Sequence, residues 1–233
     1  MRRPLHVLGT VLAVAGVLTL FWALLVWQWQ DPFTALYTKW KQHQLASQYV
    51  KRVQSFDKAV VPGPTAATEQ TIIARDAKRY RLSSKRGQVI GRLRVPRMGV
   101  NMLLVNGTDH DTLKKGPGRD MRTFMPGENR LVYIAGHRTT YLAPFSHIDR
   151  LQSGDRVTIE VPYGTFIYTV TRHRIVKATD LSVLRSPRHE VVALQACHPR
   201  FFASHRYIAY ARLLRVEPRG AKPYEATAQA SGK

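Results

Sequence analysis

An uncharged apolar segment near the N-terminus constrains this chain of 233 residues more than any other feature. Residues 4–30 contain no Asp, Glu, Lys or Arg, and residues 8–29 are apolar with few exceptions. A helix of about 22 residues is roughly 33 Å long, which matches a hydrocarbon core of about 30 Å. The segment ends in Leu-Val-Trp-Gln-Trp-Gln, which lacks the small residues of a signal-peptide cleavage site. We therefore expect one uncleaved transmembrane helix.

The chain is strongly basic, with 36 Lys and Arg residues against 15 Asp and Glu residues and a formal net charge of +21. Such a charge favours anionic surroundings, such as nucleic acid, acidic lipid or a polyanionic cell wall. The basic residues are scattered, and we find no zinc-finger spacing, glycine-rich phosphate loop or RNA-binding aromatic signature. We therefore expect no nucleic-acid partner. Lys and Arg nearly balance across the two ends of the apolar segment, so charge alone does not orient the helix.

Composition divides the chain into four parts. Residues 1–30 form the N-terminus and the membrane anchor, and residues 31–87 form a polar, basic stalk or linker. Residues 88–216 are enough for a domain with its own hydrophobic core. Residues 217–233 carry Pro, Gly, Ala and Ser without periodicity, so we expect a disordered tail.

Short apolar segments separated by turn residues dominate the third part. Residues 156–161 alternate apolar and polar side chains, Pro-Tyr-Gly turns the chain, and residues 165–177 continue as a long strand, which predicts a hairpin. Many short strands with turns between them predict an all-β barrel or sandwich with antiparallel pairing. Further strands are expected at residues 89–96, 102–105, 131–136, 191–196 and 206–216, a helix or arm at 72–85, and short helices at 109–115 and 143–151.

Three reactive side chains lie at the ends of predicted strands. Cys197 is the only cysteine and ends one apolar run, His137 follows another, and Arg206 opens a third. At one rim of a barrel they supply a nucleophile, a proton carrier and a fixed positive charge, which acyl transfer through a thioester needs. Each residue alone also fits a structural role, as a buried thiol, a loop histidine or a strand-edge charge. The joint placement favours catalysis.

Two other histidines lie near Cys197. His198 is its neighbour, but adjacent residues of a strand point to opposite faces, so His198 is badly placed as the base. Cys197, His198 and His205 lack the paired ligand spacing of a structural zinc site. We therefore expect no metal and no cofactor.

A series of motifs occurs in order between residues 91 and 216. The series comprises Gly91-Arg92-Leu93-Arg94-Val95-Pro96, Gly116-Pro117-Gly118 with Thr123, Pro126-Gly127 and Asn129, Ala135-Gly136-His137-Arg138-Thr139-Thr140-Tyr141, Ala143-Pro144-Phe145 with residues 151–155, and Cys197-His198-Pro199 with Arg206. Together these motifs resemble the sortase family, most closely the class E sortases of actinobacteria. The resemblance implies a closed eight-stranded β-barrel with short helices, preceded by one membrane anchor with a cytoplasmic N-terminus, and a catalytic domain outside the cytoplasmic membrane.

The resemblance also implies a reaction. Cys197 would attack the Thr–Gly bond of a C-terminal sorting signal on a secreted protein and form a thioester. His137 would transfer protons, and Arg206 would hold the oxyanion. The acceptor would be an amine of a peptidoglycan precursor or, as a second choice, a pilin lysine. Class E resemblance indicates a Leu-Ala-x-Thr-Gly signal in preference to Leu-Pro-x-Thr-Gly.

One position departs from the sortase pattern. Sortases usually carry threonine directly before the nucleophile, whereas this chain has Ala196. Ala196 has no hydroxyl to bond the substrate, although its backbone stays available. We still expect Ala196, Tyr141 and Thr139 to lie in the substrate site.

Two alternatives stay open. Another cysteine enzyme is one, but the Ser-His-Gly-Cys pattern of L,D-transpeptidases is absent and papain-like hydrolases place the cysteine before the histidine. The other is a membrane-anchored, catalytically degenerate β-domain that binds the cell wall, in which Cys197 would be unreactive.

Overall fold

Strand pairing closes a barrel. The computed structural model describes residues 2–29, 32–57 and 65–226. In the last of these ranges eight strands follow one another in the order β6-β5-β1-β2-β3-β4-β7-β8, and pairing of β6 with β8 closes the ring. This confirms the eight-stranded barrel. The strands are β1 Val89–Val95, β2 Val100–Asn106, β3 Gly118–Arg119, β4 Leu131–Ala135, β5 Arg156–Val161, β6 Gly164–Lys177, β7 Val191–His198 and β8 His205–Pro218.

Most neighbouring strands are antiparallel, including the predicted β5–β6 hairpin. Two pairs, β2–β3 and β4–β7, are parallel. The alternation of side chains along each strand separates the core from the outer face. On β7, Val192, Leu194 and Ala196 lie in the core, whereas Ala193 packs in a second cluster on the opposite face. Cys197 therefore lies on the outer face of the barrel.

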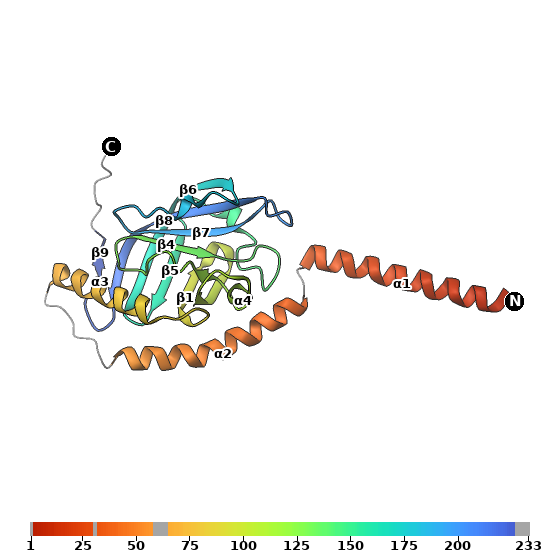
Figure 1. Ribbon diagram of the computed structural model, residues 1–233, viewed down its shortest axis with the longest axis horizontal. Helices are drawn as coiled ribbons and strands as arrows, with labels where there is room; N and C mark the ends of the chain where they lie inside the picture. Colours follow the sequence, from red (N-terminus) through yellow and green to blue (C-terminus); the bar gives the residue numbers. More distant parts are fainter. Residues whose placement is uncertain (1, 30–31, 58–64, 227–233) are drawn as a thin grey trace.

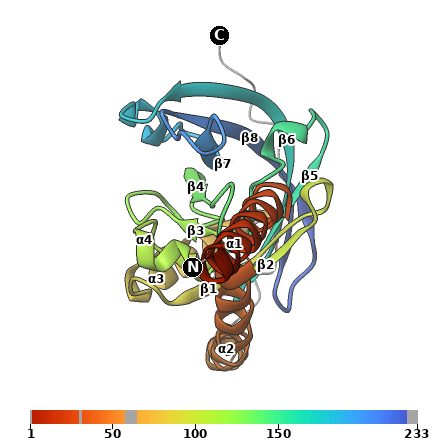
Figure 2. The ribbon, with the colours of Figure 1, turned by 90° about the vertical axis from the view of Figure 1, so that its right-hand side faces the viewer.

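The helix α1 (Arg2–Trp29) extends away from the barrel (Figure 1). Its segment His6–Leu24 has a mean hydropathy of 2.3, and none of it is buried inside the protein. By length and composition this segment is a candidate membrane span. Figure 2 views the barrel from the side of α1.

The segment expected as a stalk forms two helices that pack on the barrel. They are α2 (Pro32–Asp57) and α3 (Ala66–Ser83). Leu45 of α2 is buried in a cluster with side chains of β1 and β2, and Ile73 and Tyr80 of α3 belong to the main core. A stalk is the simplest interpretation of a polar, basic composition, but here one face of each helix is apolar enough to bury.

Two further expectations need correction. Residues 217–226 of the expected tail are ordered: β8 continues to Pro218, and β9 (Tyr224–Glu225) pairs with β8, while residues 227–233 lie outside the described residues. The helix expected at 143–151 is only a short 3-10 turn, η2 (Ile148–Arg150). Tyr141, Leu142 and Ala143 have φ angles of 53°, 62° and 37°, which a right-handed helix excludes. The other short elements are η1 (Pro96–Met98), the expected turn α4 (His110–Leu113), and η3 (Leu181–Leu184).

The carboxyl group of Glu190 is buried within the fold. Glu190 accepts hydrogen bonds from the Tyr168 hydroxyl at 2.6 Å and from the backbone N–H groups of Gly127 and Asn129 at 2.9 and 3.1 Å. Burial raises the pKa of Glu190 to about 7, and the three hydrogen bonds only partly oppose it. Ionised Glu190 therefore costs the folded state free energy at neutral pH.

Replacing Glu190 with Gln is expected to flatten the pH dependence of stability. The folded-state pKa of about 7 lies above the ordinary value of 4.5, so the folded protein binds this proton more tightly than the unfolded chain. Binding of this proton stabilises the fold fully below the ordinary pKa of 4.5. The stabilisation decreases as the pH rises to the folded-state pKa, by up to about 3 kcal/mol in all. Urea unfolding at a series of pH values from acid to neutral measures this decrease. Equal pH slopes for Glu190→Gln and wild type would contradict the assignment, and Glu225→Gln, with an exposed side chain, is the control.

Candidate active site

Strand register brings the three predicted residues to one place. Cys197 on β7 pairs directly with Arg206 on β8. On the other side of β7, Ala135 of β4 pairs with Gln195, and the Gly136 backbone N–H donates to the Gln195 carbonyl at 3.0 Å. Because β4 and β7 run parallel, His137 lies level with Cys197. Cys197, His137 and Arg206 all line one cavity of about 260 Å³.

The cavity lies on the outer face of the barrel, with strand residues of β4, β7 and β8 among its lining. The segment between β6 and β7, which includes η3, forms one wall with Ala178, Leu181, Val183 and Leu184, and Leu113 of α4 contributes a further apolar side chain. Asp120 and Arg122 also line it and form an ion pair at 2.7 Å. Burial opposes ionisation of Asp120, but the hydrogen bonds from Arg122 outweigh it and lower the pKa of the carboxyl group. One wall of the cavity is therefore apolar, and on another wall the opposite charges of Asp120 and Arg122 balance each other.

His137 is a half-buried histidine beside two other aromatic rings. Its ring centroid lies 5.1 Å from that of Tyr141 and 6.4 Å from that of His110. Burial, and then the nearby His110, lower the pKa of His137. Its Nε2 is buried and has no hydrogen-bond partner among the described residues. A neutral imidazole with an unused ring nitrogen is able to accept a proton near neutral pH.

Arg206 is held through one end of its guanidinium group. Nη1 donates to the carbonyls of Ala203 at 2.7 Å and His205 at 3.0 Å. Within the described part of the chain, Nε and Nη2 form no hydrogen bond or ion pair, although the residue lines the cavity. These donors are available to an oxyanion formed near Cys197.

Arg138 is a buried residue that the sequence analysis did not single out. Its Nη1 donates to the Cys197 carbonyl at 3.1 Å and contacts His198 Nδ1 at 3.0 Å, and its Nη2 pairs with Asp149 at 3.2 Å. Arg138 therefore ties the loop that carries His137 to the strand end that carries Cys197. The sequence did contain a signal for this role, because Arg138 is a charged residue directly after a catalytic candidate at the end of a buried strand. His198 contacts Arg138. This agrees with the prediction that His198 and Cys197 point to opposite faces of the strand.

The expected substrate contacts are only partly brought together. The side chain of Ala196 is fully buried in the barrel core and points away from the cavity, so only its backbone is left for a substrate. Strand alternation explains this placement, because Ala196 and Cys197 face opposite sides. Thr139 is half-buried and does not line the cavity, whereas Tyr141 lies against His137.

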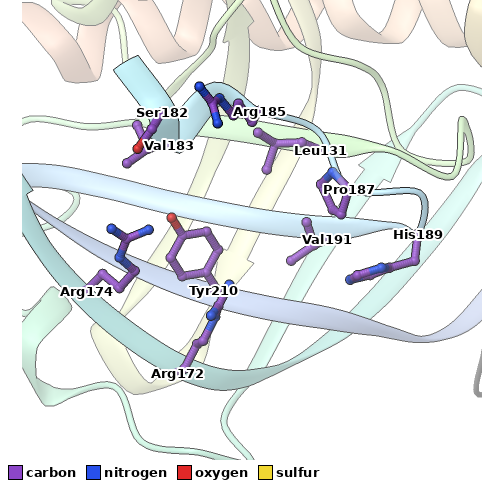
Figure 3. Close-up of a pocket in the computed structure, with 10 residues that line it drawn as sticks. All are labelled: Leu131, Arg172, Arg174, Ser182, Val183, Arg185, Pro187, His189, Val191 and Tyr210. Atoms are coloured by element: carbon purple, nitrogen blue, oxygen red, sulfur yellow. The ribbon is translucent and has the colours of Figure 1, made fainter. Parts of the chain in front are cut away.

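A second cavity, of about 180 Å³, lies toward the other end of the same strands (Figure 3). Leu131, Val191 and Tyr210 form its floor, and Arg172, Arg174, Arg185 and His189 surround it. It contains none of the predicted catalytic residues and no thiol. The candidate active site is therefore the cavity at Cys197.

A closed barrel with a thiol, an imidazole and a guanidinium group in one cavity defines a class of cysteine enzyme scaffold. The sortase domain matches residues 93–214, more than half of the chain. The chain belongs to the sortase family.

The chain is similar to several named sortases. It is 33% identical to Sortase D of Bacillus subtilis over 131 residues, which are 54% of this chain and 64% of that protein. It is 25% identical to Sortase SrtE1 of Streptomyces coelicolor over 160 residues, which are 62% and 46% of the two chains. The structure of sortase E from Streptomyces avermitilis superposes with a TM-score of 0.51 at 29% identity and covers 57% of this chain and 93% of that one. The chain thus spans less than two thirds of the two curated relatives.

Replacing Arg138 with Gln is expected to lower the free energy of unfolding by about 3 kcal/mol. The change leaves the Cys197 carbonyl and Asp149 without their charged partner. Chemical denaturation of the full chain in detergent micelles measures the loss. Arg150→Gln, an exposed position in η2, is the control and is expected to change stability by no more than about 0.5 kcal/mol. Equal stabilities of the Arg138 and Arg150 variants would contradict a clamping role.

Proposed function

We propose that this chain is a membrane-anchored cysteine transpeptidase that cleaves a C-terminal sorting signal between Thr and Gly and transfers the protein to a cell-wall amine. One observation carries the proposal: the register of β4, β7 and β8 gathers His137, Cys197 and Arg206 in a single cavity. Membership of the sortase family supports the substrate class.

In the first half-reaction, the thiol proton of Cys197 passes to His137. The Cys197 sulfur attacks the threonine carbonyl carbon, and Arg206 binds the oxyanion of the tetrahedral intermediate. The intermediate collapses, the Thr–Gly bond breaks, and His137 returns its proton to the leaving glycine amine. The products are a free glycine amine and a thioester on Cys197.

In the second half-reaction, an acceptor amine attacks the thioester and gives a proton to His137. Collapse of the new tetrahedral intermediate forms the amide bond and releases the Cys197 sulfur, which recovers the proton. We propose a peptidoglycan precursor as the acceptor, with a pilin lysine as the second choice.

The class, the sorting signal and the topology are further parts of the proposal. We propose class E, and hence a Leu-Ala-x-Thr-Gly signal, on the motif order and on the similarity to Streptomyces sortases. Sortase D of Bacillus subtilis is more identical in sequence, so both signal types belong in the test. We propose that α1 anchors the chain, with residues 1–30 as anchor and cytoplasmic N-terminus and the barrel outside the membrane, where lipid and secreted substrates meet.

Substitution of the three site residues is expected to separate their roles. Wild-type full chain in detergent, mixed with Leu-Ala-x-Thr-Gly and Leu-Pro-x-Thr-Gly peptides and an amine, is expected to give the transpeptidation product by mass. Cys197→Ala removes all product. His137→Gln and Arg206→Gln are expected to lower kcat/KM by about 10² to 10³.

The matched controls are His205→Gln and Arg212→Gln, which change the same residue types outside the cavity and are expected to keep activity within about threefold. A folded wild type that makes no product with either peptide would sink the proposal and favour a degenerate wall-binding domain.

A further inference from the structure

The first turns of α2 reach the loop that carries His137. Thr34 Oγ1 accepts a hydrogen bond from the Tyr141 backbone N–H at 3.0 Å, across 107 positions of sequence. The Tyr37 ring lies edge-on to the Tyr141 ring at a centroid distance of 6.4 Å. Figure 1 shows the start of α2 at the end of the barrel where α4 lies. The segment directly after the candidate membrane span therefore touches the active-site loop.

This contact belongs to a helix that is docked along its length. The Thr38 hydroxyl donates to the Lys114 carbonyl at 2.8 Å, and Thr38 is fully buried. The Gln42 side chain exchanges hydrogen bonds with the backbone N–H and carbonyl of Leu103, at 2.7 and 3.0 Å. Leu45 is buried against β1 and β2. Because α2 is fixed at these points, Thr34 and Tyr37 present a rigid surface to the loop.

The loop depends on outside support. Tyr141, Leu142 and Ala143 all have left-handed φ angles. Residues in this region cost of order 1–3 kcal/mol each and persist only where their surroundings hold them. The Tyr141 ring lies against His137 at 5.1 Å, so the same residue that α2 holds also covers the imidazole.

We propose that Thr34 and Tyr37 are positioning residues for His137. They hold Tyr141, and Tyr141 sets the orientation and the solvent exposure of the imidazole. Full catalytic rate then requires the juxtamembrane part of α2, and not the barrel alone. The inference rests on the proposed function for its kinetic consequence, whereas the structural coupling stands by itself.

Several titratable or charged groups lie near His137. His110 on α4 and Tyr141 on its own loop contact the ring. Cys197 on β7, Arg206 on β8, Asp180 beside η3 and the Asp120–Arg122 ion pair share its cavity. Releasing Tyr141 changes none of these charges but opens the ring to water. Because burial lowers the pKa of His137, exposure is expected to raise it toward its ordinary value.

The test uses the full chain in detergent micelles with Thr34→Val, Tyr37→Leu and the double substitution. Ser47→Ala is the matched control, since it removes an exposed hydroxyl from the same helix that bonds only within α2. Transpeptidation kinetics give kcat and KM. Histidine NMR gives the titration of His137, identified by the signal that His137→Gln loses.

The double variant is expected to lose about tenfold in kcat with KM nearly unchanged. Its His137 titration, and the matching limb of the pH–rate profile, shift to higher pH, while Ser47→Ala behaves as wild type. If the wild type shows no transpeptidation but the double variant still shifts the His137 titration, the proposed function fails and the structural coupling stands. An unchanged His137 titration in the double variant would overturn the inference. A lower melting temperature of the double variant, together with changed titrations of all histidines, would also overturn the inference.

Discussion

Parallel pairing between β4 and β7 is the contact on which the rest of the site depends. It sets Ala135 level with Gln195, so the residues two positions further along each chain, His137 and Cys197, reach one cavity. A shift of one residue would turn Cys197 into the core and Ala196 outward, because strand side chains alternate. The antiparallel β7–β8 pairing then adds Arg206 opposite Cys197. Backbone hydrogen bonds thus place the reactive groups before any side chain interacts.

Side chains from outside these strands refine that placement. Arg138 bonds the carbonyl of Cys197 from the histidine loop, and α2 holds Tyr141, whose ring lies against His137. The histidine loop is therefore fastened at two points, once to β7 and once to α2. Such external restraint is what a half-buried imidazole with an unpartnered nitrogen needs to keep one orientation.

The strands and the three central residues were predictable, because strand alternation and turn residues are local signals and motif order is visible in one sequence. The parallel β4–β7 pairing was not, since register between segments 60 positions apart depends on closure of the whole barrel. Nor was the docking of α2. Its polar composition suggested a free stalk, whereas Gln42 and Thr38 bury their polar groups against backbone carbonyls and N–H groups.

The central claim is that Cys197 is the nucleophile in a cavity that contains His137 and Arg206. Intact-mass spectrometry of the full chain, quenched in acid shortly after mixing with sorting-signal peptide and no amine, tests it directly. The account predicts an added mass equal to the peptide up to its threonine, located on Cys197 and released by hydroxylamine. Peptide cleavage that persists in Cys197→Ala, or an adduct on another residue, would contradict it.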